Sequence, residues 1–173
     1  MFDTIAALGI IGLQIGIVVT IIGWITGASF VKHIARYSGT LIACIFTIAV
    51  TMSLIYQYVF GYEPCILCWY QRIAIFPIAI TTWIVDMRKS TSFQKQVLVL
   101  AVIGILIAAL HVFVDMFPGA GVDVCGAAGA SCLVRYVYKF GYITIPMMSF
   151  TVLASGILLT LLAKRYPADS TTA

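Results

Sequence analysis

Five long apolar stretches, almost free of charge, constrain this chain more than any other feature of its sequence. They cover residues 5–26, 38–60, 66–85, 96–114 and 142–163. Crossing a bilayer as a helix takes about 20 mostly apolar residues, and four of the stretches contain no Asp, Glu, Lys or Arg. They are too long and too continuous for membrane β-strands, which alternate polar and apolar side chains over about ten residues. The pattern predicts an all-α polytopic membrane protein with five spans.

The composition excludes most soluble folds. Apolar residues make up 62% of the 173 residues and charged residues only 9%, against about 45–50% and 25% in a soluble domain. The net charge of +4 is small and scattered, so we expect no nucleic-acid partner and take the lipid bilayer as the solvent. The length suits one domain and leaves no room for a separate soluble catalytic domain.

The basic residues predict the orientation of the spans, because cytoplasmic loops of membrane proteins are enriched in Lys and Arg. Seven of the ten lie on one side of the predicted spans: Lys32, Arg36, Arg88, Lys89, Lys95, Lys164 and Arg165. Arg72, Arg135 and Lys139 lie on the other side. We therefore expect the N-terminus and the loops 61–65 and 115–141 on the outer face. The first stretch lacks the basic start of a signal peptide and is expected to remain as a helix.

Five cysteines are placed so that four of them form two pairs on this outer face. Cys65 and Cys68 form a C-x-x-C motif at the mouth of the third stretch, and Cys125 and Cys132 share the second outer loop. Cys44 stands alone inside the second stretch, where we expect it to behave as a small apolar residue. Disulfides persist in exported compartments, so both pairs are candidates for redox chemistry or for structural disulfides.

The C-x-x-C pair favours redox chemistry over the two other interpretations. As a structural disulfide it would close almost no loop and remove little entropy from the unfolded chain. A four-thiolate metal site would have an unusual spacing between its two pairs, so no metal is expected. Pro64 suits a helix start, and the N–H groups of that start favour a thiolate, the species that attacks in disulfide exchange. The glycine-rich and alanine-rich segment around Cys125 and Cys132 suits a pair that must reach a partner.

Two further residues are candidates for the same site. Arg72 lies inside the third stretch, four residues after Cys68 and on the same helix face, where its charge would stabilise a Cys68 thiolate. Snorkelling to the lipid headgroups is the alternative. His111, near the outer end of the fourth stretch, could reach the same depth or serve only in packing. Because the chain has no dinucleotide-binding or haem-attachment motif, a lipid-soluble quinone is the expected electron acceptor.

The residues around the C-x-x-C motif resemble a known family. The segment 64–72, with the sequence PCILCWYQR, is similar to the quinone-linked motif of the bacterial DsbB/BdbC thiol oxidases. The likeness covers residues 38–164 and includes Gln57, His111, the Cys125 and Cys132 pair and the segment 140–146. A C-x-x-C followed four residues later by Arg at a helix mouth, with a second outer pair, is far more specific than a lone C-x-x-C.

The resemblance implies a four-helix transmembrane bundle plus one additional N-terminal transmembrane helix. Residues 38–166 would form the DsbB-like membrane domain. An added helix and a cytoplasmic loop over residues 1–37 would precede it, and a disordered tail over 167–173 would follow it. The implied location is the bacterial cytoplasmic membrane, with the N-terminus and both cysteine pairs on its outer face.

The resemblance also implies an activity, that of a thiol:quinone oxidoreductase which supports disulfide formation in exported proteins. Cys125 would form a mixed disulfide with a thioredoxin-like DsbA/BdbD-type partner, and Cys132 would resolve or regenerate it. Electrons would then pass through Cys65 and Cys68 to ubiquinone or menaquinone. The implied site residues are Cys65, Cys68, Cys125 and Cys132 for the exchange, and Arg72, Cys68 and His111 for the quinone.

Two other functions stay open. A non-catalytic membrane scaffold or small transporter could carry the same cysteines as structural disulfides in its outer loops. Within redox chemistry, the chain could be a reductase that works outward, or an enzyme like the vitamin-K-epoxide reductases. That family places its C-x-x-C on a late span, whereas here the motif lies on the third of five predicted spans.

Overall fold

The computed structural model describes residues 2–86, 90–117, 132 and 134–167. These residues form six helices: α1 (Phe2–Thr26), α2 (Phe30–Arg36), α3 (Ser38–Tyr58), α4 (Ile66–Ile84), α5 (Thr91–Met116) and α6 (Ile145–Arg165). The expected all-α class is confirmed, and the apolar stretches correspond to α1, α3, α4, α5 and α6. The short helix α2 lies where a loop is expected from the sequence, and the expected disordered tail falls outside the described residues from 168 onward.

Four of these helices are long and apolar enough to cross a membrane: α1, α3, α5 and α6. The prediction of five spans is thus only partly confirmed, since α4 is not among the four. The first turns of this 19-residue helix carry Trp69, Tyr70, Gln71 and Arg72, which lower its mean hydropathy. The same turns follow directly on the C-x-x-C motif, so the polar residues that weaken the span gather where the candidate chemistry lies.

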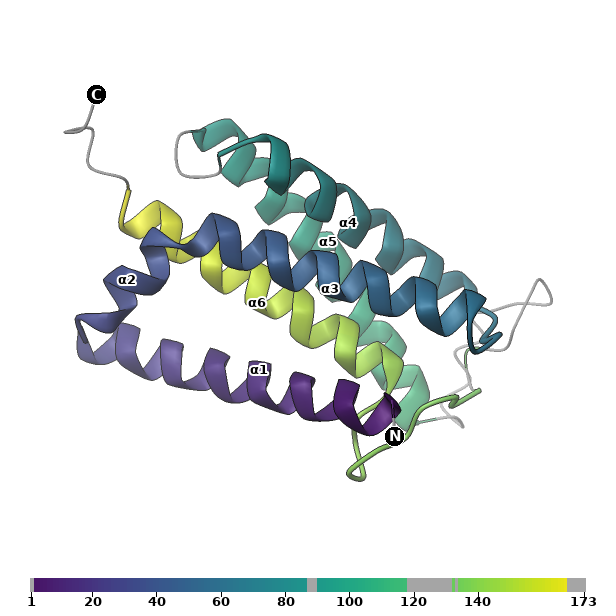
Figure 1. The fold of residues 1–173 in the computed structure, drawn as a ribbon. Coiled ribbons are helices and arrows are strands. Elements are labelled where there is room, and N and C mark those ends of the chain that lie inside the picture. Colours follow the sequence, from purple (N-terminus) through teal and green to yellow (C-terminus); the bar gives the residue numbers. More distant parts are fainter. Residues whose placement is uncertain (1, 87–89, 118–131, 133, 168–173) are drawn as a thin grey trace.

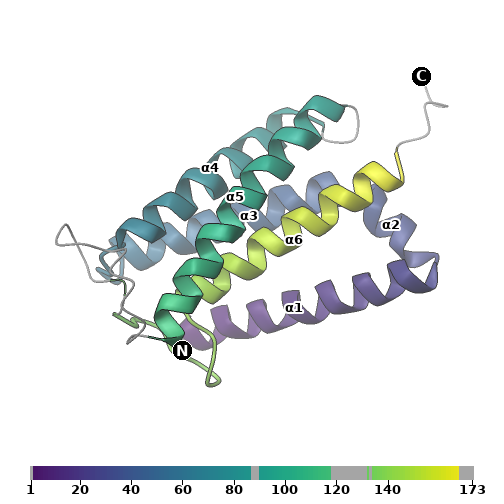
Figure 2. The ribbon, with the colours of Figure 1, turned by 180° about the vertical axis from the view of Figure 1, so that it is seen from behind.

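Helix α6 is the centre of the bundle and packs against each of the other five helices of the described chain. In both views of the ribbon it lies between α1 and the other long helices (Figures 1 and 2). Of its most apolar window 56% is buried inside the protein. Close packing depends on Gly156, because a Cβ there would lie 2.7 Å from the ring of the fully buried Phe46. The core that positions the site is therefore made by α3, α4, α5 and α6.

Helix α1 lies on the outside of this core. Gly27, with a φ of +71°, ends α1 and turns the chain into α2, a backbone conformation that glycine adopts without strain. Helix α2 buries Val31 and Ala35 against α6, and Gln14 of α1 donates a hydrogen bond of 3.1 Å to Thr151 of α6. Only 11% of the most apolar window of α1 is buried inside the protein, so most of this helix faces outward.

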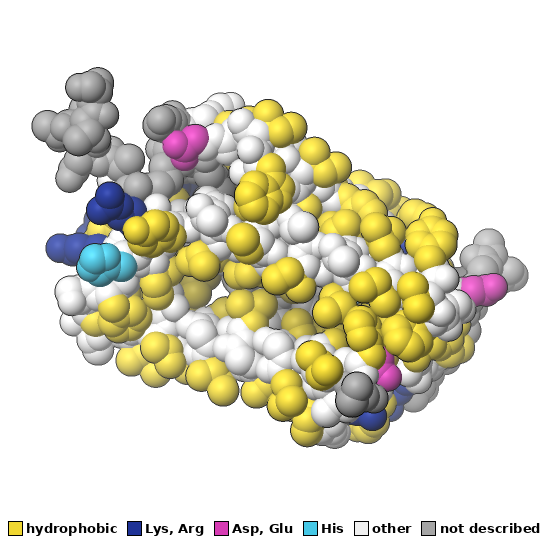
Figure 3. Space-filling model, viewed as in Figure 1, with side chains coloured by type: hydrophobic (Ala, Val, Ile, Leu, Met, Phe, Trp, Pro, Cys, Tyr) yellow, Lys and Arg dark blue, Asp and Glu magenta, His cyan; other side chains and the backbone are white. Residues whose placement is uncertain are grey.

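The outward surface is that of a protein surrounded by lipid. Figure 3 shows hydrophobic side chains over most of one face, with basic side chains near its two ends. Along α1, Ile15 is 59% exposed and Ile25 is 81% exposed. A water-soluble protein does not expose such a continuous apolar surface.

Candidate redox site

The C-x-x-C motif lies at the start of α4, and its first cysteine caps the helix. Cys65 is the N-cap residue, and its sulfur accepts a hydrogen bond of 3.4 Å from the backbone N–H of Cys68. The two sulfurs lie 3.1 Å apart, and both residues are free thiols. Cys65 is only 5% exposed. The helix start therefore holds a dithiol, buried at Cys65 and partly buried at Cys68, at the N–H groups that favour a thiolate.

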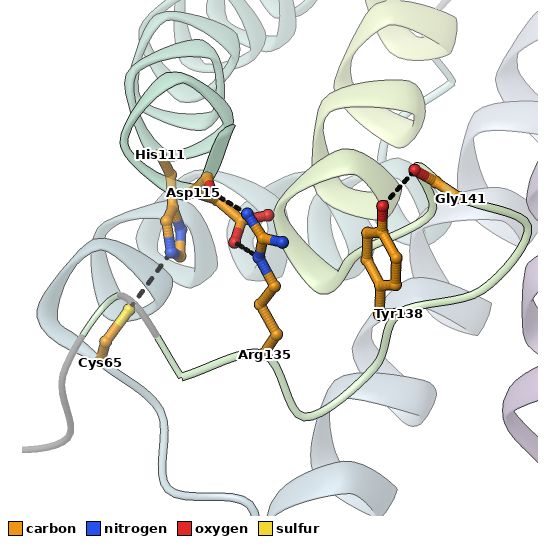
Figure 4. A network of polar contacts seen from close by, with 6 residues as sticks. All are labelled: Cys65, His111, Asp115, Arg135, Tyr138 and Gly141. Carbon is orange, nitrogen blue, oxygen red and sulfur yellow. Dashed lines mark hydrogen bonds and ion pairs between the residues drawn. The ribbon is translucent and has the colours of Figure 1, made fainter. Parts of the chain in front are cut away.

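His111 comes from α5 and meets Cys65 in the interior, as Figure 4 shows. Its Nε2 lies 3.7 Å from Cys65 Sγ, and its Nδ1 lies 3.1 Å from the amide nitrogen of Gln71. Because an amide nitrogen only donates, Nδ1 accepts, and the ring proton is on Nε2, facing the sulfur. The hydrogen bonds with Cys68 and His111 lower the pKa of Cys65 to about 4, against the opposing effect of burial. Cys65 is the thiolate of the pair.

Cys132 reaches the same place from the second outer loop. Its sulfur, the sulfur of Cys65 and a ring nitrogen of His111 all lie within 4.8 Å of one another. Cys132 is disulfide-bonded and only 5% exposed. Its expected partner, Cys125, lies outside the described residues. The structure thus brings a disulfide sulfur beside a free dithiol, although 66 residues lie between Cys65 and Cys132 in the sequence.

An ion pair fastens the segment that follows Cys132 to α5. Arg135 Nε donates to Asp115 Oδ1 at 2.6 Å, and Arg135 Nη2 donates to the Asp115 carbonyl oxygen. Asp115 is only 5% exposed and lies one turn after His111 on the same helix. Figure 4 shows both contacts of Arg135 beside the pair of Cys65 and His111. The ion pair therefore holds the loop that carries Cys132 next to the helix that carries His111.

Arg72 is held by α3. Its Nε donates to Ser53 Oγ at 2.9 Å, its Nη2 donates to the Ser53 carbonyl at 3.1 Å, and its Nη1 donates to Gln57 Oε1. The guanidinium also lies 5.1 Å from the centre of the Trp69 ring. These four contacts direct the cation into the protein, which disfavours the snorkelling interpretation for Arg72.

A cavity of about 570 Å³ opens beside the dithiol. Five of the six site residues expected from the sequence line it: Cys65, Cys68, Arg72, His111 and Cys132. The sixth, Cys125, lies outside the described residues. Apolar side chains of α1, α3 and α6 line much of the rest, and Tyr56 is also part of the lining. The buried Tyr56 hydroxyl lies beside the carboxylate of Asp3, at the start of α1.

Cys65, His111 and Cys132 form a cluster that offers three ligand atoms for a metal ion. A cysteine binds metal as a thiolate, and Cys132 is disulfide-bonded. Cys68, the third described cysteine of the two pairs, is not part of that cluster. The arrangement therefore suits thiol–disulfide exchange better than the four-thiolate site considered from the sequence.

Several residues of the site were not singled out by the sequence alone. Gln71 orients His111, Ser53 holds Arg72, and Asp115 pairs with Arg135. Each is a polar residue inside or at the end of an apolar stretch, which is the signal that could have found it. Their partners come from other helices, so the sequence could not say what they bind.

The fold and the site together define a class: a helical membrane protein with a dithiol at a helix start and a second disulfide in contact distance. A family model described as "Disulfide bond formation protein DsbB" matches residues 35–163. The chain belongs to the DsbB family of membrane disulfide bond formation proteins. The match begins after α1, so that helix lies outside the part of the chain that the family model covers.

Curated relatives agree with this assignment. A "Probable disulfide formation protein" of Chlamydia pneumoniae is 36% identical over 138 residues, which is 80% of this chain and 97% of the relative. The "Disulfide bond formation protein C" of Bacillus subtilis is 36% identical over 103 residues, covering 59% of this chain and 74% of the relative. No solved structure gives a significant match to the chain.

Proposed function

We propose that this protein is a thiol:quinone oxidoreductase that reoxidises a thioredoxin-like partner and passes the electrons to a membrane quinone. The observation that carries the proposal is the position of the Cys132 disulfide sulfur within 4.8 Å of Cys65, which belongs to a free dithiol. Structural disulfides need no second dithiol beside them. A pair that exchanges with another pair must meet it at this distance.

The exchange balances between the dithiol of the partner and the four cysteines of this chain. A reduced partner breaks the Cys125–Cys132 disulfide, becomes oxidised itself and leaves two thiols. The Cys132 thiolate then attacks Cys65 of the oxidised C-x-x-C pair, so that the Cys65–Cys132 bond forms and Cys68 leaves as a thiolate. Cys125 next attacks Cys132, which restores the first disulfide and releases Cys65. The net result is a reduced C-x-x-C pair, the state in which Cys65 and Cys68 are found.

His111 and Gln71 prepare Cys65 for this exchange. The Nε2–H group of His111 faces the sulfur, so it stabilises the thiolate that forms whenever a bond to Cys65 breaks. Gln71 donates to Nδ1 and thereby keeps the proton on the side of the sulfur. The Asp115–Arg135 ion pair keeps the loop of Cys132 within reach.

The cavity fits a quinone as the substrate that takes the electrons. Its volume lies in the range of small-molecule sites, about 300–1,000 Å³, and it joins a polar end to an apolar end. A quinone takes up two electrons and two protons as it becomes a quinol. Arg72 lines the cavity and is the group of this chain that would donate to the oxygen atoms of the quinone, whereas His111 would act on the quinone through Cys65. Ubiquinone and menaquinone both meet this description.

The membrane arrangement is part of the proposal. Helix α4 would be a fifth span, held in the bilayer by its packing against α3 and α5. The basic residues orient the bundle with both cysteine pairs on the outer face of the bacterial cytoplasmic membrane. Residues 38–166 would be the DsbB-like domain, and residues 1–37 an addition to it.

The test is anaerobic turnover of purified protein with a reduced thioredoxin-like partner, followed by quinone absorbance. The wild type should reduce quinone, and Cys68→Ser should not, because this variant cannot form the C-x-x-C disulfide. Cys44→Ser is the matched control, since Cys44 is a free cysteine exposed on α3 and outside the cavity lining. Turnover retained in Cys68→Ser would contradict the mechanism. Absence of turnover with every partner and quinone would favour a scaffold with structural disulfides.

A further inference from the structure

The cavity beside the dithiol does not end at the polar site but continues along α1. Its lining includes Ile5, Gly9 and Leu13 of α1 and Ile45 and Met52 of α3, and residues of α6 complete it. At a rise of about 1.5 Å per residue, the lined part of α1 is about 12 Å long. The cavity therefore has an extended apolar arm in addition to its polar end.

This arm lies between two helices whose backbones stand apart. No Cα atom of α1 lies within 8 Å of a Cα atom of α3, and both helices are described over their whole length. Figure 3 shows a hollow between the side chains of these two helices, on the face that carries mostly hydrophobic groups. Because that face would lie in the bilayer, the hollow is a lateral opening toward lipid.

Both ends of the opening are closed. At the start of α1, the ring of Phe2 lies 5.7 Å from the ring of Tyr56 and 5.1 Å from the ring of Phe60. At the other end, α2 connects α1 to α3 and packs against α6 (Figure 1). Aromatic rings thus separate the cavity from the outer water, and an occupant reaches the site sideways, from the membrane.

We propose that α1 forms a subsite for the isoprenoid tail of the quinone, with the tail leaving the cavity between α1 and α3. The inference rests on the proposed function and deepens it. The quinone head is polar and the tail is apolar, which is the order in which polar and apolar side chains line the cavity from Arg72 to Leu13. Since the family match begins at residue 35, the α1 wall of the subsite belongs to the part of this chain that lies outside the family model.

Gly9 is the position at which the tail subsite can be filled without disturbing the fold. A Cβ added there would meet no atom within 4 Å, and Gly9 lines the cavity. Gly12 is the matched control, because a Cβ there also meets nothing within 4 Å, but Gly12 is not part of the lining. Both residues lie on α1 and are exposed, so Gly9→Phe and Gly12→Phe change the helix alike.

The experiment compares a quinone with a long isoprenoid tail and a tail-less benzoquinone. For Gly9→Phe, the KM for the long-tailed quinone should rise at least about tenfold, which corresponds to about 1.4 kcal/mol. The KM for the tail-less quinone should stay at the wild-type value, and Gly12→Phe should match the wild type with both. Equal effects of Gly9→Phe on both quinones, or no effect on either, would overturn the tail subsite. Failure of the wild type to reduce either quinone would instead contradict the proposed function.

Photolabelling gives a readout that does not depend on turnover. A quinone with a diazirine on its tail should label the α1 peptide that contains Gly9, and excess long-tailed quinone should prevent the labelling. The Gly9→Phe variant should lose the label, and Gly12→Phe should keep it. Labelling confined to peptides of α3, α5 or α6 would show that the tail leaves elsewhere and would overturn the inference.

Discussion

The two walls of the cavity are built in opposite ways. On the side of α4 and α5, the polar side chains are held by named hydrogen bonds: Arg72 to Ser53, and His111 to Gln71. On the side of α1, the lining is apolar and includes Gly9, around which there is open space. The contrast indicates that electron transfer needs groups fixed to within a fraction of an ångström, whereas an apolar chain needs only room and an apolar surface.

The largest effect on this comparison should come from Arg72→Ala. Because hydrogen bonds to a charged group contribute about 1.5–3 kcal/mol, kcat/KM for quinone should fall roughly 10- to 100-fold. The loss should be the same for long-tailed and tail-less quinones, since Arg72 lies at the polar end of the cavity. Arg72→Lys keeps the charge but lacks the forked donors, so it should be intermediate. Unchanged quinone kinetics in Arg72→Ala would remove Arg72 from the binding wall.

Arg135→Ala should have the next largest effect, and it should act on turnover with the reduced thioredoxin-like partner. Without its partner, Asp115 no longer holds the loop that follows Cys132, and small misplacements of reacting groups are costly, so partner-driven turnover should fall roughly tenfold. Lys139→Ala, in the same segment and outside the cavity lining, is the control. The measurement is the rate at saturating quinone with varied reduced partner. Equal rates for Arg135→Ala and wild type would show that the ion pair does not position Cys132.

His111→Ala should change the pH dependence of Cys65. His111 is one of the groups that lower the pKa of Cys65 to about 4, so loss of its hydrogen bond should raise that pKa. Alkylation follows the thiolate, so the variant should react more slowly in mildly acidic buffer and equally fast at alkaline pH. Mass spectrometry can follow the Cys65 peptide with Cys44 as an internal reference. An unshifted profile would contradict the role of His111.

The smallest effect is expected on the α1 wall, from Gln14→Leu. This change removes the hydrogen bonds of Gln14 with Thr151 and Tyr142, and a hydrogen bond contributes about 0.5–1.5 kcal/mol to stability. Thermal unfolding in detergent should therefore show a slightly lower midpoint, with turnover of tail-less quinone at the wild-type rate. A large loss of that turnover would show that the position of α1 matters to the polar end as well, and the two walls would not be independent.

Much of the fold could be predicted because hydropathy is a local property. Each apolar stretch becomes a helix, since a chain in lipid must satisfy its backbone hydrogen bonds internally. The short helix α2 was not predicted, because it depends on tertiary contacts. It forms where Gly27 turns the chain and where Val31 and Ala35 pack against α6. Helix α4 falls short of the other spans because it carries polar residues. Their partners lie on α3 and α5, so the sequence of α4 does not reveal them.

The candidate site divides in the same way. Cys65, Cys68 and Arg72 share the first turns of one helix, so their proximity follows from helical spacing alone. The meeting of Cys65 with His111 and Cys132 depends on how α4, α5 and the second loop pack. Asp115 gave no signal beyond being a polar residue at the end of an apolar stretch, and its partner Arg135 became evident only in three dimensions.

The sequence by itself determined the class of the protein: its helical spans, its two cysteine pairs and a dithiol at a helix start are all written in short-range patterns of residues. The tertiary structure alone decided which sulfurs meet, how Arg72 and His111 are held, and that α1 stands apart from α3 to leave a lateral opening. The physical reason is that hydropathy and helical spacing act between residues close in the chain. The site and its cavity arise from contacts between helices, where polar side chains in an apolar solvent bind whichever partner the packing brings to them.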